Sequence, residues 1–122
     1  MAEIYVGVDV SKDWLDVARV EGVEVTPIVR FGNHAEGIAE LLSEIKASEV
    51  ALVVMEATGG YETLAANTLA AAGVPLAVVN PKQVRDYAKA KGRLAKTDRL
   101  DACVLAEFGR DLRPEVRALP DQ

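Results

Sequence analysis

The chain has 122 residues, half of them hydrophobic and 5% aromatic, with a formal net charge of −5 at pH 7. This length suits one ordinary domain with one core, and no apolar run is long enough to cross a membrane. The N-terminus lacks the basic-then-apolar pattern of a signal peptide. A single cysteine excludes an internal disulfide and fits a cytoplasmic setting, and a single histidine argues against a His-rich zinc site or a Ser-His-Asp triad within this chain.

The first third of the chain predicts three strands. Residues 4–8 form an apolar strand that ends at Asp9, and residues 13–20 alternate loosely as a second strand. Residues 23–31 are rich in β-branched side chains, and Pro27 indicates that this third strand lies at an edge. The short connections favour an antiparallel meander.

The rest of the chain alternates helices with strands. The predicted elements are an amphipathic helix at 34–47 with Asn33 as its N-cap, a buried parallel strand at 50–55 that ends in Glu56, a helix at 61–72, a strand at 76–79, a helix at 82–90 and a last helix at 98–110. Residues 1–110 form the predicted domain, and residues 111–122, with two prolines, form a tail without a core.

The element order β-β-β-α-β-α-β-α-α is that of the ribonuclease H-like fold, an α/β fold with a mixed five-stranded sheet flanked by helices. Right-handed crossovers place the fourth strand beside the first, which gives the sheet order 3-2-1-4-5. The alternative is a plain doubly wound α/β domain, and the opening meander argues against it.

Two acids, Asp9 and Glu56, end neighbouring parallel strands in this arrangement. Neighbouring strands of a sheet lie about 4.8 Å apart. Open α/β sheets bind ligands just outside these strand ends. Two carboxylates this close repel each other, and without a cation one of them would keep its proton. A divalent metal would relieve this repulsion.

Asp98 and Asp101 are three residues apart at the start of the last helix, so they are expected to share one helix face. The same stripe continues to the apolar Leu105 and Phe108, so the two aspartates are expected to point inward. The simpler alternative is that they only complement the positive end of the helix dipole. Together with the two strand-end acids they favour a metal site, and because all four ligands are carboxylates the predicted ion is Mg²⁺ or Mn²⁺.

The chain also contains a basic segment, which overlaps the start of the predicted last helix. Residues 82–99 carry seven Lys or Arg and two Asp, a charge of +5, which leaves −10 for the rest of a chain with a total of −5. Such a segment can hold the phosphate backbone of a nucleic acid. The candidate contacts are Lys12, Lys82, Arg85, Lys89, Lys91, Arg93, Lys96 and Arg99.

Two smaller features allow two interpretations each. The backbone N–H groups of residues 58–60 could approach a phosphate, although a tight turn between strand and helix is the simpler expectation. Trp14 and Tyr61 could stack on bases, although a packing role is the simpler expectation for each.

Four motifs in this order resemble the DEDD transposases of the "one-ten" insertion-sequence family, which are bacterial mobile-element recombinases. The motifs are GVDVSK at 7–12, MEATGGY at 55–61, VNPKQV at 79–84 and KTDRLDA at 96–102. The resemblance implies a RuvC-like, ribonuclease H-type domain with a catalytic, Mg²⁺-binding tetrad. Residue by residue, that tetrad falls on Asp9, Glu56, Asp98 and Asp101.

The resemblance also implies DNA transposition in the bacterial cytoplasm, on the nucleoid, by a homo-oligomer of two or more copies. Members of this family use a structured guide RNA and a C-terminal domain with a serine nucleophile, which is absent from this chain. Three alternatives remain open. The chain could be a stand-alone junction resolvase or nuclease, an actin-like or sugar-kinase ATP-binding half-domain, or a non-catalytic nucleic-acid-binding module.

Overall fold

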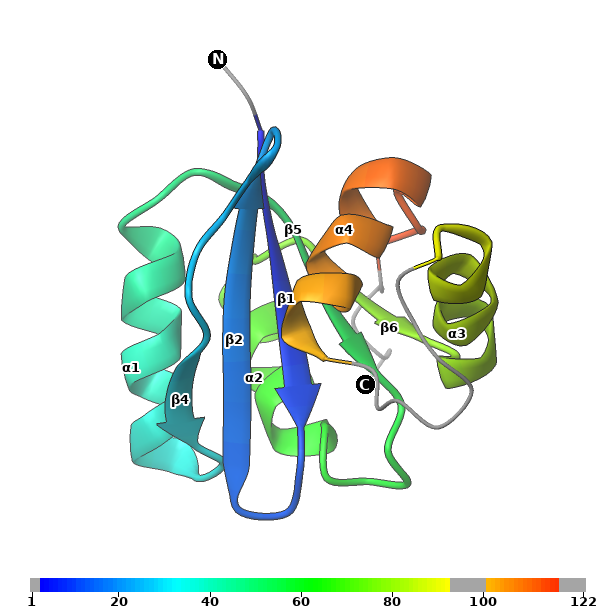
Figure 1. Ribbon diagram of the computed structural model, residues 1–122. Coiled ribbons are helices and arrows are strands. Elements are labelled where there is room, and N and C mark those ends of the chain that lie inside the picture. Colours follow the sequence, from blue (N-terminus) through cyan, green and yellow to red (C-terminus); the bar gives the residue numbers. More distant parts are fainter. Residues whose placement is uncertain (1–2, 93–100, 117–122) are drawn as a thin grey trace.

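The computed structural model describes residues 3–92 and 101–116, and it shows a sheet between two layers of helices (Figure 1). The elements in chain order are β1 (Ile4–Val10), β2 (Trp14–Glu21), β3 (Glu24–Val25), β4 (Val29–Gly32), α1 (Ala35–Lys46), β5 (Val50–Glu56), α2 (Thr63–Ala71), β6 (Leu76–Val79), α3 (Pro81–Ala90) and α4 (Ala102–Leu112). Among these helices, none has the length and apolar character needed to span a bilayer.

The sheet has the order β3-β2-β1-β5-β6, and β4 also pairs with β2. β1 and β2 are antiparallel, whereas β5 is parallel to both β1 and β6. The predicted meander, the crossovers and the order 3-2-1-4-5 are confirmed, with one change. The predicted third strand is divided into β3 and β4, and Pro27, which has no N–H group for a strand ladder, lies in the break.

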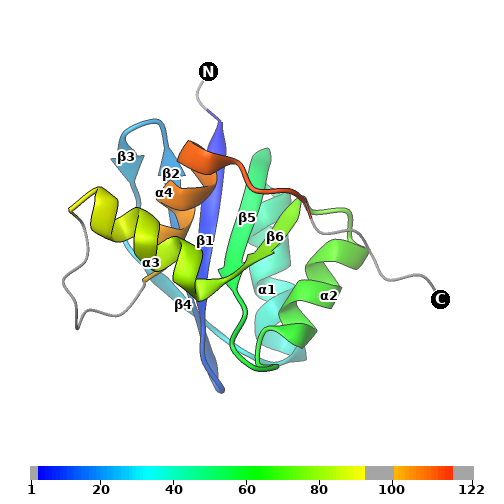
Figure 2. The same cartoon turned by 90° about the vertical axis from the view of Figure 1, so that its right-hand side faces the viewer.

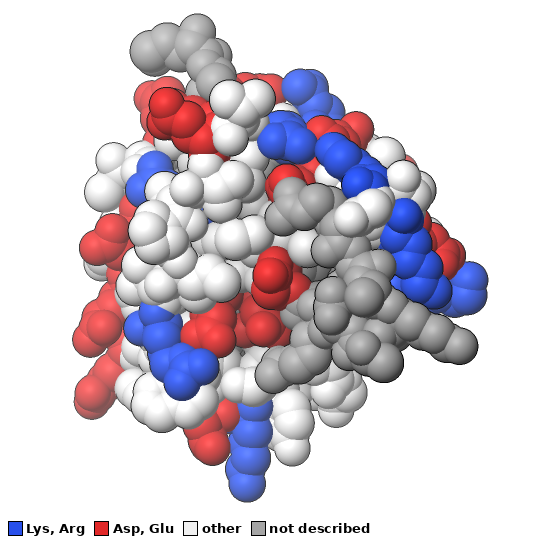
Figure 3. All heavy atoms as spheres, in the orientation of Figure 1, with Lys and Arg blue, Asp and Glu red and all other residues white. Residues whose placement is uncertain are grey.

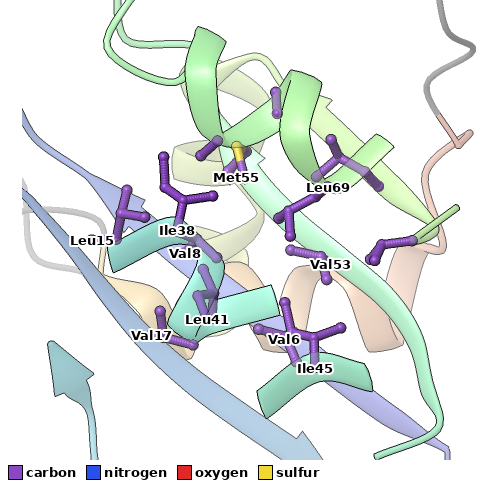
Figure 4. Close-up of a cluster of buried hydrophobic side chains, with 14 of the residues drawn as sticks. Val6, Val8, Leu15, Val17, Ile38, Leu41, Ile45, Val53, Met55 and Leu69 are labelled. Atoms are coloured by element: carbon purple, nitrogen blue, oxygen red, sulfur yellow. The ribbon is translucent and has the colours of Figure 1, made fainter. Parts of the chain in front are cut away.

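Alternating side chains of β1 and β5 fill two separate cores. Val8 and Met55 belong to the core under α1 and α2, which Figure 4 shows. Tyr5 and Val54 belong to the core under α3 and α4, on the opposite face of the sheet (Figure 2). Burial of each large aliphatic side chain contributes about 1.5–3 kcal/mol, so both faces of β1 and β5 are held firmly.

A close approach between β1 and α4 depends on Gly7. A Cβ atom at Gly7 would lie 2.0 Å from the carbonyl oxygen of Ala102 and 2.5 Å from the backbone nitrogen of Ala106. Further along the helix, a Cβ atom at Gly109 would lie 3.5 Å from the Tyr5 ring. Since Tyr5 precedes Gly7 whereas Gly109 follows Ala102, α4 runs against the direction of β1 and begins near its C-terminal end.

The N-cap of α1 is His34, whose Nδ1 accepts a hydrogen bond from the Gly37 N–H at 3.2 Å, so the prediction of Asn33 as the cap is wrong. The Asn33 side chain instead donates to the carbonyl oxygens of Ser11 (2.9 Å) and Tyr61 (3.0 Å). Asn33 therefore joins the loop after β1 to the loop after β5, and the helix begins one residue later.

The carboxylate of Asp111 fastens the end of α4 to α3. It accepts hydrogen bonds from Arg110 Nε (2.8 Å), Tyr87 Oη (2.5 Å) and Lys91 Nζ (3.0 Å). The bonds from Arg110, Tyr87 and Lys91 outweigh the effect of burial and hold the pKa of Asp111 well below its usual range. This network fixes the C-terminal end of α4 to α3, while the N-terminal end of α4 packs against Gly7 of β1.

Candidate functional site

Asp9 and Glu56 lie at the same level on adjacent strands. The parallel register of β1 and β5 pairs Val8 with Met55, and each of these residues is followed by one of the acids. Asp9 lies two residues after Gly7, the residue under α4, so strand alternation places both on the same face of the sheet. Glu56 lies two residues after Val54, whose side chain packs in the core on the α4 side, so Glu56 is on that face as well. Both acids are half-buried. Their side chains therefore emerge on the α4 side of the sheet, next to each other.

Asp101 is the N-cap of α4. Its backbone is extended (φ −119°, ψ 174°), and its Oδ1 accepts a hydrogen bond from the Val104 N–H at 2.9 Å. Asp101 therefore precedes the helix, and it is not part of the buried stripe that the spacing predicted. It directly precedes Ala102, which lies against Gly7, so it is at the same end of β1 as Asp9.

Asp98, Arg93, Lys96 and Arg99 lie outside the described residues. Within residues 3–92 and 101–116, no three Asp, Glu, His or Cys side chains are close enough to hold an ion together. The chemistry of the predicted set nevertheless fits a hard divalent cation, because all four members are carboxylates and two of them emerge side by side.

A further acid on the sheet, Asp16 of β2, could be placed beside the site only by the structure. In the antiparallel ladder it lies directly opposite Asp9, on the same face of the sheet. Arg30 lies opposite Asp16 on β4 and binds both of its carboxylate oxygens, with Nε–Oδ1 2.8 Å and Nη2–Oδ2 3.1 Å. Three residues, 11–13, connect β1 to β2. This short connection was the available signal, because it brings Val10 opposite Leu15 and hence Asp9 opposite Asp16.

One group of acidic side chains lies near the centre of the face drawn in Figure 3, and others lie along its left edge. Basic side chains lie at the lower left of this face and on its right. On one side, α3 and its C-cap carry the described part of the basic segment: Lys82, Arg85, Lys89 and Lys91. Two of these lysines also form ion pairs, Lys82 with Asp86 at 3.2 Å and Lys91 with Asp111 at 3.0 Å. Lys12 is exposed in the loop after β1.

The loop at 58–60 is a tight turn held by Glu62, as the simpler expectation had it. Glu62 Oε1 accepts hydrogen bonds from the Thr58 N–H (3.0 Å), the Thr58 hydroxyl (2.8 Å) and the Gly60 N–H (3.1 Å). Partial burial opposes ionisation of Glu62, but these bonds outweigh it and lower its pKa to about 2. Two of the N–H groups that could have faced a phosphate are therefore occupied.

We expect the Glu62 anchor to make stability depend on pH. Because the pKa of Glu62 falls from an ordinary value of 4.5 to about 2 in the folded chain, its contribution to stability is present above pH 4.5 and is lost as the pH falls towards 2. Glu62→Gln should cost about 1–2 kcal/mol at pH 7 and should lose less stability between pH 6 and pH 3 than the parent. Urea unfolding across this pH range measures the free energy of unfolding of each variant, and Glu40→Gln on the exposed side of α1 is the control. Equal pH profiles for parent and Glu62→Gln would contradict the assignment.

Trp14 and Tyr61 are about half exposed, at 47% and 52%, so neither lies in the core. Tyr61 lies in the loop that Asn33 braces. Trp14 begins β2, at the edge of the face that carries the acids.

One family model matches nearly the whole chain. A family model described as a transposase, of the IS110-type DEDD class, matches residues 6–122. The chain is similar to the pilin gene-inverting proteins of Moraxella lacunata and Moraxella bovis, with 30% identity over 120 residues in each case. The match covers 95% of this chain but 37% of each relative, so the chain spans little more than a third of their length.

Two solved structures are similar in fold. They are Thermus thermophilus RuvC (TM-score 0.64) and T. thermophilus RuvC in complex with a Holliday junction substrate (TM-score 0.63). Each match covers 90% of this chain and 96% of the other, at 16% identity. The likeness shows that the fold is RuvC-like, as predicted.

Proposed function

The chain belongs to the IS110-type family of DEDD transposases, and on this premise we propose that it is the metal-dependent catalytic domain of a DNA transposase. The observation that carries the proposal is the pair of carboxylates, Asp9 and Glu56, at the same level of adjacent strands. The start of α4 lies at the same end of β1. This arrangement suits the cleavage and transfer of DNA strands.

In the proposed site Asp9 is the central ligand, and Glu56, Asp98 and Asp101 complete the set. Two bound divalent ions would supply activation of the attacking oxygen and stabilisation of the leaving oxygen. Asp9 and Glu56 are held by the sheet, so their spacing is set before substrate binds. Asp101 would have to turn one oxygen toward the site while its Oδ1 caps α4.

The basic residues of α3 are proposed to hold the phosphate backbone of DNA or of a guide RNA. They begin directly after β6, the strand beside Glu56 in the sheet. Electrostatic contacts of this kind position a nucleic acid without reading its sequence. Lys12 and the three basic residues outside the described part belong to the same proposal.

We propose that the functional protein is larger than this domain. The relatives are nearly three times as long as the matched part, and the family resemblance implies a C-terminal domain with a serine nucleophile and a guide RNA. The metal-binding domain would then extend from residue 1 to the end of α4 at Leu112, two residues past the predicted boundary at 110, and the residues after it would lead to the further domain. A homo-oligomer acting on DNA in the bacterial cytoplasm completes this proposal.

The RuvC-like fold supports one alternative function, that of a stand-alone nuclease that resolves branched DNA. That enzyme would use the same acids and would need no further domain. Incubation of this chain with branched DNA and Mg²⁺ or Mn²⁺ separates the two functions. Repeated turnover would favour the resolvase, whereas the transposase proposal expects none without the serine domain.

Metal binding is the direct test of the proposed site. We expect millimolar Mg²⁺ or Mn²⁺ to raise the melting temperature, because an ion that binds only the folded chain at 100 times its Kd adds about 2.7 kcal/mol of stability. Thermal unfolding followed by circular dichroism, with and without EDTA, measures this effect, and equal ionic strength from NaCl is the control. A melting temperature that neither ion changes would contradict the proposal.

A further inference from the structure

The face that carries the acids also carries an exposed aromatic side chain under an exposed arginine. Trp14 is 47% exposed, and the side chain of Arg30 is 57% exposed. The Cζ of Arg30 lies 5.2 Å from the centre of the Trp14 ring. By strand alternation Trp14 shares its face with Asp16, and Arg30 lies opposite Asp16 on β4, so both belong to the face of Asp9.

Arg30 keeps donors for a ligand. A guanidinium carries five N–H groups, and the bonds to Asp16 engage one on Nε and one on Nη2. Three N–H groups remain for another acceptor. Because Asp16 holds one edge of the group and Trp14 lies against one face, the guanidinium is oriented before any ligand arrives, which lowers the entropy cost of binding.

The position of the pair relative to the acids follows from the ladder. Asp9, Asp16 and Arg30 occupy successive opposed positions on β1, β2 and β4, and each step is about 5 Å. Arg30 therefore lies about 10 Å from Asp9 along the ladder, so one strand of DNA can reach both residues. The basic helix α3 lies on the other side of the acids, so a strand that crosses them meets basic groups on both sides (Figure 3).

We propose that Trp14 and Arg30 form a binding site for an unpaired nucleotide of the DNA strand whose phosphodiester reaches the acids. Arg30 holds a phosphate oxygen, and the Trp14 ring stacks on a base. An indole stacks on any base, so the site has no strong sequence preference. The inference rests on the proposed function, because it places this nucleotide relative to the proposed cleavage site.

The first test needs no substitution, because Trp14 is the only tryptophan of the chain. We expect single-stranded oligothymidylate to quench its fluorescence in EDTA, over the same concentrations at which the anisotropy of a labelled oligonucleotide rises. Fully paired duplex should quench far less. Saturated binding without quenching, or no binding of the single strand, would overturn the proposal.

Substitutions then separate the two contacts. Trp14→Ala should weaken single-strand binding about 5- to 100-fold at unchanged salt dependence, and Trp14→Phe should restore part of the loss. Arg30→Gln should reduce the slope of log K against log salt by about 0.7, the value for one phosphate of a single strand. Lys46→Gln, on α1 at the opposite face, removes the same charge and should leave the affinity unchanged. Equal effects of Lys46→Gln and Arg30→Gln, or losses confined to RNA binding, would overturn the assignment.

Asp9→Asn distinguishes this inference from the proposed function. It should retain Trp14 quenching while it loses metal binding. Quenching together with an absence of metal binding by the parent chain would contradict the proposed function alone. Metal binding by the parent chain without quenching would contradict the Trp14–Arg30 site alone.

Discussion

Asp9→Asn should abolish binding of Mn²⁺ and Mg²⁺ to the chain, with a loss in affinity of at least about 100-fold. Loss of a group that merely orients a ligand costs about 10- to 100-fold in metal affinity, and Asp9 is proposed as the central ligand itself. The amide has nearly the same shape as the carboxylate but no charge, so it neither attracts the cation nor repels Glu56. Isothermal titration with Mn²⁺ measures the affinity.

A matched control is available four residues away. Asp13 is an exposed acid in the loop after β1, and Asp13→Asn removes the same charge near the site. We expect it to keep Mn²⁺ affinity within about twofold, because screening by solvent makes an exposed charge at this distance a small contribution. Metal binding by Asp9→Asn equal to that of the parent would exclude Asp9 as a ligand and would favour a non-catalytic nucleic-acid-binding module.

The largest effect on the fold is expected from Gly7→Ala. The added methyl group would collide with backbone atoms of α4, at 2.0 Å from the Ala102 oxygen and 2.5 Å from the Ala106 nitrogen. Backbone cannot rotate away as a side chain can, so either α4 moves off the sheet or β1 bends. We expect a loss of about 3 kcal/mol in the free energy of unfolding, at the upper end of the range for overpacking, measured by urea denaturation.

The reactivity of the single cysteine would show whether Gly7→Ala displaces α4. Cys103 lies on α4 and is partly buried, so a helix displaced by Gly7→Ala should expose its thiol to faster reaction with a thiol reagent. Gly59→Ala is the control, because the space around Gly59 is open and only its positive φ of 79° opposes a side chain. That strain costs about 1–2 kcal/mol. Unchanged thiol reactivity in Gly7→Ala would show that α4 does not depend on the glycine.

Displacement of α4 has a consequence for the site as well. The helix begins over the C-terminal half of β1, and its N-cap is Asp101. A helix that moves off Gly7 takes this aspartate away from Asp9. The same glycine therefore supports both the packing of the helix and the position of one proposed ligand.

Most of the element order could be predicted from the sequence, because periodicity is a local property. The apolar run at 50–55 indicated a buried parallel strand, and β5 lies between β1 and β6 with both faces covered. The helix at 34–47 followed from apolar residues at helical spacing. Its cap was misplaced because Asn33 and His34 can both accept a bond from a helix N-terminus, and Asn33 is engaged by two loops distant in sequence.

The polar surroundings of the candidate site were harder to predict. The partners of Asp16 and Trp14 come from β4, which follows a break at Pro27, and their pairing depends on the register of two separate ladders. The exposure of Trp14 could not be read from its apolar character, because an aromatic residue at the start of a strand suits a core or an open face equally well. Neither feature is encoded by the spacing of nearby residues.

The sequence by itself determined the series of strands and helices, the acids Asp9 and Glu56 at the ends of two strands, and the four motifs of the family. Only the tertiary structure decided that these acids share the α4 side of the sheet and that Asp16, held by Arg30, lies beside them. The physical reason is that a strand repeat of two residues fixes which side chains lie on the same face, whereas the helices that cover the sheet decide which face that is. Gly7 determines which face of β1 is covered by α4, because its missing side chain leaves room for the helix there. The helix then begins near the end of β1 at which Asp9 emerges.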